Sequence, residues 1–422
     1  MRDINEIRSD VYDIGKKASR AANEMALMTT EAKNSILRKM ACYLQEDMEY
    51  ILAANAMDVE EAKESGKTSA FVDRLTLTKE RVRDMALGLE KLASLNDPIG
   101  EVLSGWKGDQ DIEIFKTRVP IGVVGMIYEA RPNVTADAAG ICFKTGNAAI
   151  LRGSGDTKKS NSIIVKSLNR AVKDEKGPEF AIQLLEDTSR EAVGEFIKMD
   201  KYLDLLIPRG SADMIKSIVK GATVPVIETG AGNCHVYVEA SADLGMALGI
   251  LVNAKTQRPG VCNAAETLIV DNSIASEFLP LAETALLEHG VELRACPISM
   301  KYLAHSKAAD EDDYSAEYLD LIIATKVVEG LEEAIAHINT YGTGHSEAII
   351  TKDYDKAHRF TKEVDAAVVY VNASTRFTDG GMFGFGAEIG ISTQKLHARG
   401  PMGLEEMTSV KYIVRGDGQT RR

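Results

Sequence analysis

The sequence predicts an α/β protein with two parallel-sheet domains and a small β flap. From Ile121 onward, apolar runs alternate with helical segments in two successive series. Continuous apolar strands joined by helical crossovers are covered on both faces, so each series predicts a parallel sheet. A segment with alternating side chains at 101–120 and a strand-like tail at 409–416 lie outside both series and predict the flap.

The first 95 residues predict helices. Apolar and small residues recur at helical spacing across 35–66, where Gly66 ends the pattern, and a second helix fits 77–95 with Thr78 as its N-cap. Gly105, Gly108 and the alternation between Asp111 and Thr117 then indicate a hairpin.

The first strand and helix series predicts five strands joined by four helices. The strands are expected at 121–129, 148–153, 181–186, 202–208 and 224–228. Ligands of parallel sheets bind at the carboxyl ends of the strands. Three glycine-rich turns are placed there by the pattern, namely Gly153-Ser154-Gly155, Gly210-Ser211 and Gly230-Ala231-Gly232.

The second series begins near Cys234. Its strands are expected at 235–240, 266–270, 320–328, 346–351 and 366–372, and its helices at 242–256, 274–288, 331–339 and 354–363. Ser241 is the expected cap of the first of these helices. The segment 257–263 is left as a loop between a helix and a strand.

Composition excludes several classes of protein. The formal charge of −13 argues against nucleic acid or an anionic membrane as the main partner, because both need a basic face. No apolar run approaches ~18 residues, and the charged N-terminus lacks the apolar core of a signal peptide. Five scattered cysteines without a CxxC pair indicate a reduced, cytoplasmic protein. The seven histidines form no cluster at ligand spacing, so no metal site is expected.

Cys262 is the candidate nucleophile. It follows Pro259-Gly260, which forces a turn and puts the thiol on a loop, and Arg258 is a nearby cation that would favour the thiolate. The alternative is a buried cysteine that behaves as a small hydrophobe. Cys42, Cys142 and Cys296 fit that alternative, whereas Cys234 lies next to a glycine-rich turn and is intermediate.

The turn at Gly153-Ser154-Gly155 opens a helix and could receive a phosphate on its N–H groups, with Arg152 and Lys158 beside it. Lys158 occupies the third glycine position of the dinucleotide fingerprint, so an ordinary turn remains the alternative. His345 lies at a strand entrance, where a turn residue and a substrate contact are equally good interpretations.

Five segments together resemble the aldehyde dehydrogenase superfamily, and within it the branch that acts on L-glutamyl 5-phosphate. They are residues 119–156, 224–239, 255–270, 333–350 and 369–416. The resemblance implies a cofactor-binding domain from 1–100 and 121–228, to which the chain returns after about 373. It further implies a catalytic domain at 229–372 and an oligomerisation flap from 101–120 and 395–422, hence a homo-oligomer.

The resemblance also implies a reaction. NADPH would reduce L-glutamyl 5-phosphate to L-glutamate 5-semialdehyde and phosphate through a thioester on Cys262, in proline biosynthesis, with glutamate 5-kinase as a possible partner. Glu228 matches the base that activates water in hydrolytic members, and Asn133 matches the oxyanion-stabilising residue. Glu317 matches the residue that holds the nicotinamide ribose. The implied cofactor contacts are Arg152, Gly153, Ser154, Gly155, Lys158, Gly210 and Ser211.

Arg131, Arg258 and Arg376 lie on expected loops and are candidate partners for the substrate's phosphate and α-carboxylate, as is His345 for the substrate. Two alternatives stay open. One is a hydrolytic NAD(P)-dependent aldehyde dehydrogenase that uses Glu228 to activate water. The other is a non-catalytic scaffold of the same fold.

Overall fold

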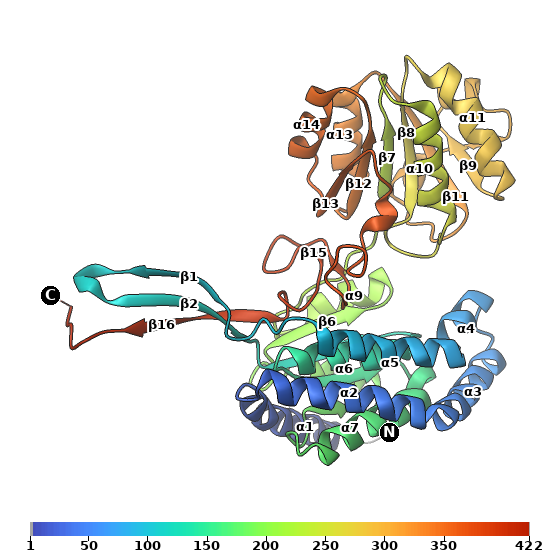
Figure 1. Cartoon of the computed structure of the whole chain (residues 1–422). Helices are drawn as coiled ribbons and strands as arrows, with labels where there is room; N and C mark the ends of the chain where they lie inside the picture. Colours follow the sequence, from blue (N-terminus) through green and yellow to red (C-terminus); the bar gives the residue numbers. More distant parts are fainter. Residues whose placement is uncertain (1–2, 422) are drawn as a thin grey trace. The chain divides into compact units, whose positions relative to one another are not determined.

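The computed structural model describes residues 3–421, which divide into two compact units. The first unit contains the chain up to Thr229, the segment Gly384–Gly390 and the chain from Met402 onward. The second contains Gly230–Phe383 and Ile391–Pro401. Each unit is built on its own parallel sheet (Figure 1), so the predicted α/β class is confirmed.

Five helices open the first unit. They are α1 (Ile4–Met25), α2 (Thr30–Glu46), α3 (Met48–Glu64), α4 (Ser69–Leu75) and α5 (Lys79–Ser94). The Thr78 side chain accepts a hydrogen bond from the Arg81 N–H at 3.2 Å, so the predicted N-cap is confirmed. Gly66 follows α3 with φ of +73°, a conformation that favours glycine.

A buried ion pair ties α2 to the segment that follows α5. Lys33 Nζ lies 2.5 Å from Asp97 Oδ2, and both side chains are buried. The same carboxylate oxygen also accepts a hydrogen bond from the Thr30 hydroxyl at 2.8 Å. Each charge therefore depends on the other for compensation in this packed layer.

The first unit's sheet has four parallel strands in the order β5-β4-β3-β6. They are β3 (Val123–Tyr128), β4 (Ala148–Gly153), β5 (Ile182–Leu184) and β6 (Leu205–Arg209), connected by α6 (Asn133–Lys144), α7 (Lys158–Asp174) and α8 (Arg190–Phe196) and followed by α9 (Ala212–Gly221). Side chains alternate between the faces of β3. The Tyr128 hydroxyl contacts Thr135 of α6 at 2.7 Å, whereas a β-carbon at Gly125 would lie 2.9 Å from the Phe196 ring of α8.

The predicted fifth strand at 224–228 is wrong. Only Val226 forms a bridge, with Leu206, and the segment is otherwise irregular. Pro225 lies in the middle of it and has no N–H to donate, although its carbonyl accepts the Leu206 N–H at 2.9 Å. The segment therefore runs beside β6 without extending the sheet.

The flap is a three-stranded antiparallel sheet in the order β1-β2-β16, seen as a long ribbon in Figure 1. Its strands are β1 (Val102–Lys107), β2 (Glu113–Pro120) and β16 (Thr408–Arg415). Trp106 and Tyr412 pack edge to face at 6.2 Å but stay about half exposed. Its oligomerisation role remains a prediction.

Two predicted boundaries need correction. Residues 395–401, predicted as flap, belong to the second unit, because β14 (Ile391–Ser392) pairs with β15 (Gly400–Pro401) and Arg399 binds Asp365. The return of the chain to the first unit, expected after about 373, begins at Gly384.

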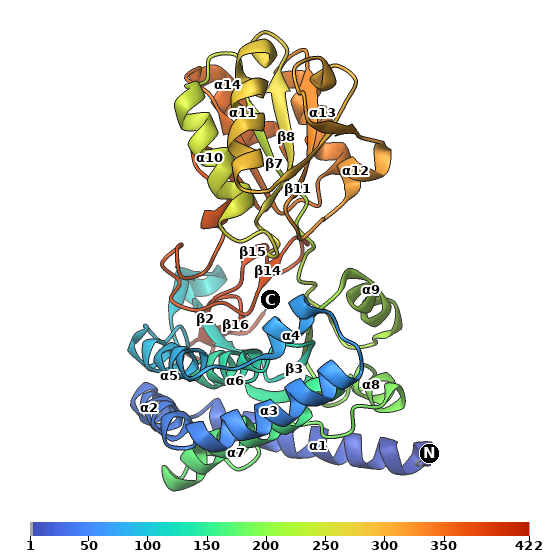
Figure 2. The ribbon, with the colours of Figure 1, turned by 90° about the vertical axis from the view of Figure 1, so that its right-hand side faces the viewer.

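The second unit's sheet has seven parallel strands in the order β10-β9-β11-β8-β7-β12-β13. They are β7 (Cys234–Val238), β8 (Ala265–Asp271), β9 (Glu292–Ala295), β10 (Ser306–Ala308), β11 (Ile322–Val328), β12 (Ser346–Ile350) and β13 (Val368–Val371). Helices α10 (Leu244–Thr256) and α11 (Ala275–Glu288) cover one face, whereas α13 (Leu331–Tyr341) and α14 (Tyr354–Glu363) cover the other (Figures 1 and 2). Val236 faces the first pair of helices and Tyr237 the second.

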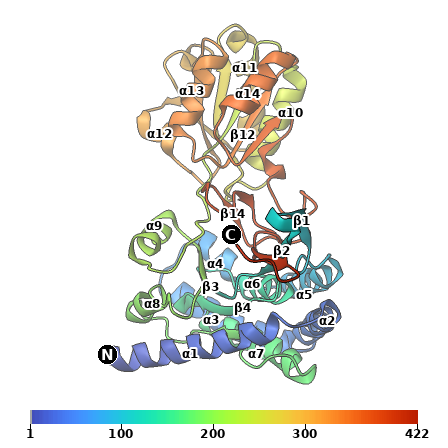
Figure 3. The same ribbon diagram turned by 90° about the vertical axis from the view of Figure 1, so that its left-hand side faces the viewer.

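Several short elements of this unit were not predicted, among them β9, β10 and α12 (Glu311–Ser315). Figure 3 shows α12 on the same side of the unit as α13. The predicted cap Ser241 is also wrong. Asp243 caps α10 by accepting the Met246 N–H at 3.1 Å, whereas the Ser241 hydroxyl donates to Glu239 at 2.6 Å. Among residues 3–421, no helix is long and apolar enough to cross a membrane.

We expect Lys33→Met to lower the free energy of unfolding by about 3–5 kcal/mol, because it leaves the Asp97 carboxylate buried without its cation. Urea denaturation measures this loss. Lys17→Met is the matched control, because Lys17 pairs with Asp13 at the surface, where such pairs contribute under about 1 kcal/mol. Equal losses in the two variants would contradict the role assigned to the buried pair.

Candidate active site

Cys262 lies on a loop whose two ends are joined by a buried ion pair. The loop leaves the last turn of α10 and enters β8, and at its base Lys255 Nζ lies 2.6 Å from Glu266 Oε2. Both side chains are fully buried. Burial raises the pKa of Glu266 to about 7 and lowers the pKa of Lys255. The hydrogen-bonded pair fixes the base of the loop while Cys262 itself stays half-buried.

This loop lies at the amino edge of the second sheet. Cys262 precedes β8, Gly232 precedes β7, Glu317 precedes β11 and His345 precedes β12. Since the strands are parallel, the segments that enter them share one edge. The sequence predicted ligand-binding turns at carboxyl ends only for the first series of strands, and it predicted Cys262 on a loop between a helix and a strand, which is confirmed.

Gly232 contacts the Cys262 backbone directly. A β-carbon at position 232 would lie 1.5 Å from the carbonyl oxygen of Cys262, so only glycine fits. The Gly232 N–H in turn donates to Glu317 Oε1 at 2.7 Å. Burial raises the pKa of Glu317. The structure thus brings Glu317 and Cys262 to opposite sides of one glycine, which sequence spacing could not show.

Cys234 supports the same carbonyl. Its thiol donates to the Cys262 oxygen at 3.2 Å, and burial raises its pKa well above the ordinary value. It therefore remains a protonated donor rather than a nucleophile.

The other three cysteines lie on other segments of the chain: Cys42 on α2, Cys142 on α6 and Cys296 directly after β9. Cys142 and Cys296 are buried, as expected. The expectation of burial is wrong for Cys42, which is exposed on α2 and donates to Glu46 at 3.3 Å.

Arg376 lies beside the Cys262 loop on the short helix η4 (Thr375–Phe377). Its Nε–H donates to Gln257 at 2.9 Å and its Nη1–H to Asn263, so it contacts the loop on both sides of Cys262. Burial and then the charge of Arg258 lower the pKa of Arg376, whereas Cys262 raises it by attraction. Arg258 itself is exposed. Sequence reasoning missed Asn263, although a polar residue directly after a candidate nucleophile was a usable signal.

His345 does not face solvent. It is fully buried, its Nδ1 lies 2.8 Å from the Ser346 hydroxyl, and burial lowers its pKa to about 4. The turn position was predicted correctly, but the imidazole points into the unit beside Cys234 and stays neutral at pH 7. This placement does not favour a direct substrate contact.

Asn133, Arg131 and Glu228 belong to the first unit and are all half-buried. Asn133 begins α6, and its Nδ2 donates to Asp137 at 3.0 Å. One N–H of this amide is therefore used to orient it, and the second has no hydrogen-bond partner among the described residues. Burial raises the pKa of Asp137 to about 6. Glu228 ends the irregular segment beside β6.

The turn between β4 and α7 contains two buried polar atoms without hydrogen-bond partners among the described residues. They are Arg152 Nε and the Ser154 hydroxyl oxygen. Such orphaned polar atoms are rare, and a polyhydroxylated ligand would satisfy them. Gly153 is required by packing, because a β-carbon there would lie 2.0 Å from Asn161. Gly155 and Lys158 are exposed at the same turn.

The second predicted cofactor turn is already hydrogen-bonded. The Ser211 N–H at the start of α9 donates to Glu129 Oε2 at 3.0 Å, and a β-carbon at Gly210 would lie 2.6 Å from that oxygen. A carboxylate of the chain itself thus occupies the helix end at Ser211, which was expected to contact the cofactor.

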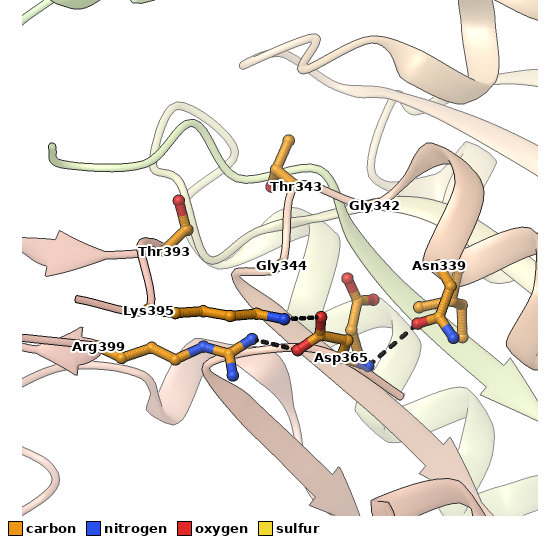
Figure 4. A pocket seen from close by; sticks show the side chains of 10 residues that line it. Asn339, Gly342, Thr343, Gly344, Asp365, Thr393, Lys395 and Arg399 are labelled. Atoms are coloured by element: carbon orange, nitrogen blue, oxygen red, sulfur yellow. Dashed lines mark hydrogen bonds and ion pairs between the residues drawn. The ribbon is translucent and has the colours of Figure 1, made fainter. Parts of the chain in front are cut away.

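A polar cavity of about 410 Å³ lies in the second unit (Figure 4), lined in part by Gly342, Thr343 and Gly344, which directly precede His345. At its wall, Asp365 binds both Lys395 and Arg399, and its N–H donates to Asn339 at 3.0 Å. Glu347 also lines the cavity and accepts the His235 backbone N–H at 2.8 Å. Among the described residues, no group of three or more His, Cys, Asp or Glu side chains could hold a metal ion.

We expect Gly232→Ala to lower the free energy of unfolding by at least about 2 kcal/mol, because the added carbon must displace the backbone of Cys262. Urea denaturation measures the loss. Gly249→Ala is the matched control, since that glycine lies in α10 with open space around it, where alanine favours a helix. A fully stable Gly232→Ala protein would refute the close approach.

The buried imidazole of His345 should make stability depend on pH. The unfolded side chain binds a proton near pH 6.5, whereas the folded one does so only near pH 4, so its contribution is present above pH 6.5 and falls as the pH drops. We expect roughly 2 kcal/mol of this contribution to be lost between pH 7 and pH 5. Chemical denaturation at both pH values should show that His345→Gln loses less free energy of unfolding between pH 7 and pH 5 than the unchanged protein. Equal losses in the two proteins would contradict the lowered pKa of His345.

Comparisons with known proteins show which family the chain belongs to. The model of the "Aldehyde dehydrogenase family" matches residues 5–292 and 321–413. The chain is 56% identical over 407 residues to a "Gamma-glutamyl phosphate reductase" of Heliobacterium modesticaldum, covering 96% of this chain and 98% of the relative. A relative of the same name from Carboxydothermus hydrogenoformans is 56% identical over 412 residues, covering 98% of this chain and 99% of the relative.

The crystal structure of gamma-glutamyl phosphate reductase from Thermotoga maritima superposes with a TM-score of 0.95 at 48% identity, covering 98% of this chain and 100% of that one. The chain belongs to the aldehyde dehydrogenase family.

Proposed function

We propose that the protein reduces L-glutamyl 5-phosphate to L-glutamate 5-semialdehyde and phosphate with NADPH, as a step of proline biosynthesis. The observation that carries this proposal is the half-buried Cys262 on a loop held between Gly232, Glu317 and Arg376. The names of the relatives from H. modesticaldum and C. hydrogenoformans supply the substrate.

The thiol suits an acyl phosphate. The Cys262 thiolate attacks the C5 carbonyl carbon, an S–C bond forms, and the C–O bond to phosphate breaks with its electron pair on the leaving phosphate. The product is a thioester, which accepts hydride far better than a carboxylate. After reduction the C–S bond breaks, the aldehyde carbonyl forms, and the sulfur leaves again as thiolate.

Charge develops on the substrate oxygen during attack and during reduction. The Cys262 N–H and the second Nδ2–H of Asn133 are the proposed donors, and one such donor is typically worth ~3 kcal/mol. Asp137 holds the Asn133 amide through the other N–H, so this donor is oriented in advance. Arg376, Arg258 and Arg131 are the proposed partners of the substrate's phosphate and α-carboxylate.

A nicotinamide cofactor would supply the hydride. The orphaned Arg152 Nε and Ser154 hydroxyl fit its adenosine ribose, and Glu317 fits the nicotinamide ribose. The positive charges of Arg152 and Lys158 at the same turn favour a cofactor with a 2′-phosphate, which supports NADP(H). Ser211 can bind a cofactor phosphate only if Glu129 moves away.

We further propose that the enzyme acts in the cytoplasm as a homo-oligomer assembled through its flap, whose strands β1 and β16 expose Trp106, Val410 and Val414. An acyl phosphate is reactive and must be made close to where it is used. A glutamate 5-kinase is therefore the proposed supplier of the substrate.

The test is NADP⁺ reduction with glutamate 5-semialdehyde, with and without inorganic phosphate. We expect turnover only with phosphate, because phosphate must cleave the thioester in this direction. Cys262→Ala should lose at least about a thousandfold in kcat, as expected for removing a covalent nucleophile. Equal turnover without phosphate, abolished by Glu228→Gln, would favour the hydrolytic alternative; no turnover would favour the scaffold.

A further inference from the structure

We propose that Asn263 is a positioning residue that fixes the Arg376 guanidinium beside the Cys262 sulfur. The positive charge of Arg376 would then make Cys262 react preferentially with anionic electrophiles. The proposal rests on the proposed function only for the identity of the anion, which would then be the phosphoryl group of the substrate. Its residues all lie within the second unit.

The Asn263 side chain is 5% exposed, and both of its polar atoms are bonded to the η4 segment. Nδ2 donates to the carbonyl oxygen of Thr378 at 2.8 Å, and Oδ1 accepts the Nη1–H of Arg376. Because the amide has a donor and an acceptor, it can join a backbone carbonyl and a guanidinium at once. A side chain with only one of these functions cannot.

The Asn263 backbone is held by the same segment. Its carbonyl oxygen accepts the Thr375 hydroxyl at 2.7 Å. The η4 segment is anchored in turn, because the Thr378 hydroxyl lies 2.7 Å from that of Ser346 and 2.8 Å from that of Tyr370. Since Asn263 directly follows Cys262, these hydrogen bonds hold the segment that carries Arg376 against the backbone of the Cys262 loop.

Arg376 keeps binding capacity in this arrangement. A guanidinium has five N–H donors, and among the described residues Gln257 and Asn263 accept from one each. Arg258, Asp379, Cys262 and Cys234 are the charged or titratable groups that act on it, and Cys262 attracts it. The guanidinium is half-buried, so solvent screens its field less than at the surface.

An amide at position 263 preserves the positive charge of Arg376. An aspartate side chain at this position would be nearly isosteric, but its carboxylate would neutralise the guanidinium and would face the Thr378 carbonyl without a donor. Asn263→Asp therefore changes the net charge beside Cys262 while it leaves the shape of side chain 263 almost unchanged.

Selective alkylation of Cys262 tests the proposal without substrate or cofactor. The rate constants for iodoacetate, an anion, and for iodoacetamide, its neutral isostere, are measured in the full chain by peptide mass spectrometry. Both reagents consume the same thiolate, so their rate ratio reports the local field and not the thiolate fraction. Cys42, exposed on α2 of the first unit, is an internal reference in every sample.

We expect Asn263→Asp, Asn263→Ala and Arg376→Gln each to lower the iodoacetate-to-iodoacetamide ratio at Cys262 about fivefold, while the ratio at Cys42 stays constant. Asn272→Asp is the matched control, because Asn272 is exposed just beyond β8, at the opposite edge of the same sheet. Adding Asn263→Ala to Arg376→Gln should lower the ratio no further, since both act through one guanidinium.

Thr375→Val and Thr375→Ser keep the test decisive if the Asn263 variants fail to fold. The valine removes the hydroxyl that holds the Asn263 carbonyl and should lower the ratio, whereas serine should preserve it. An unchanged ratio in Arg376→Gln, or an equal fall in Asn272→Asp, would overturn the proposal. So would a fall in Arg376→Gln that neither the Asn263 variants nor Thr375→Val reproduces.

The same variants separate this proposal from the proposed function. A lowered ratio together with phosphate-independent oxidation would retain the positioning role and reject the acyl-phosphate reaction. If the reaction holds, Asn263→Asp should raise the KM for phosphate more than it lowers kcat, because the lost charge acts on binding of the anion.

Discussion

The contact between Gly232 and the carbonyl of Cys262 is the constraint on which the second unit's site depends. Only a residue without a β-carbon lets these two backbone segments approach, and the approach carries the Gly232 N–H to Glu317. The Lys255–Glu266 pair fixes the base of the same loop, and the Cys234 thiol holds its carbonyl. The backbone of Cys262 is thus held by Gly232, by the ion pair at the base of its loop and by the Cys234 thiol, while Cys262 stays half-buried.

The two units differ in the charged and polar groups that they present. In the second unit, Arg376 and Arg258 place positive charge around Cys262, although the whole chain carries a formal charge of −13. The net charge of the chain therefore does not predict the local charge around Cys262. In the first unit, Asp137 orients the Asn133 amide, and the β4–α7 turn leaves Arg152 Nε and the Ser154 hydroxyl without partners among the described residues. Cys262 and the β4–α7 turn therefore belong to different units, each with its own parallel sheet.

The sequence predicted those elements whose pattern is strong. Long apolar runs such as β8 and cap residues such as Thr78 are local signals, and they were confirmed. The strand at 224–228 was predicted wrongly because the prediction followed its apolar residues and ignored Pro225. Strand β9 was missed because a segment of four residues with two charges resembles a loop. The Cys262 loop was recognised from its turn, but its place at the amino edge, the inward His345 and the role of Asn263 depend on pairing between distant segments, which spacing does not encode.

The central claim is that Cys262 becomes acylated, and a single-turnover experiment tests it most directly. The protein is mixed with isotopically labelled glutamate 5-semialdehyde and NADP⁺ in the absence of phosphate, and NADPH and labelled peptides are counted. The account predicts a burst of one NADPH per active site and a labelled acyl group on the peptide that contains Cys262, released by added phosphate. A burst without label on that peptide, or label on another cysteine, would contradict it.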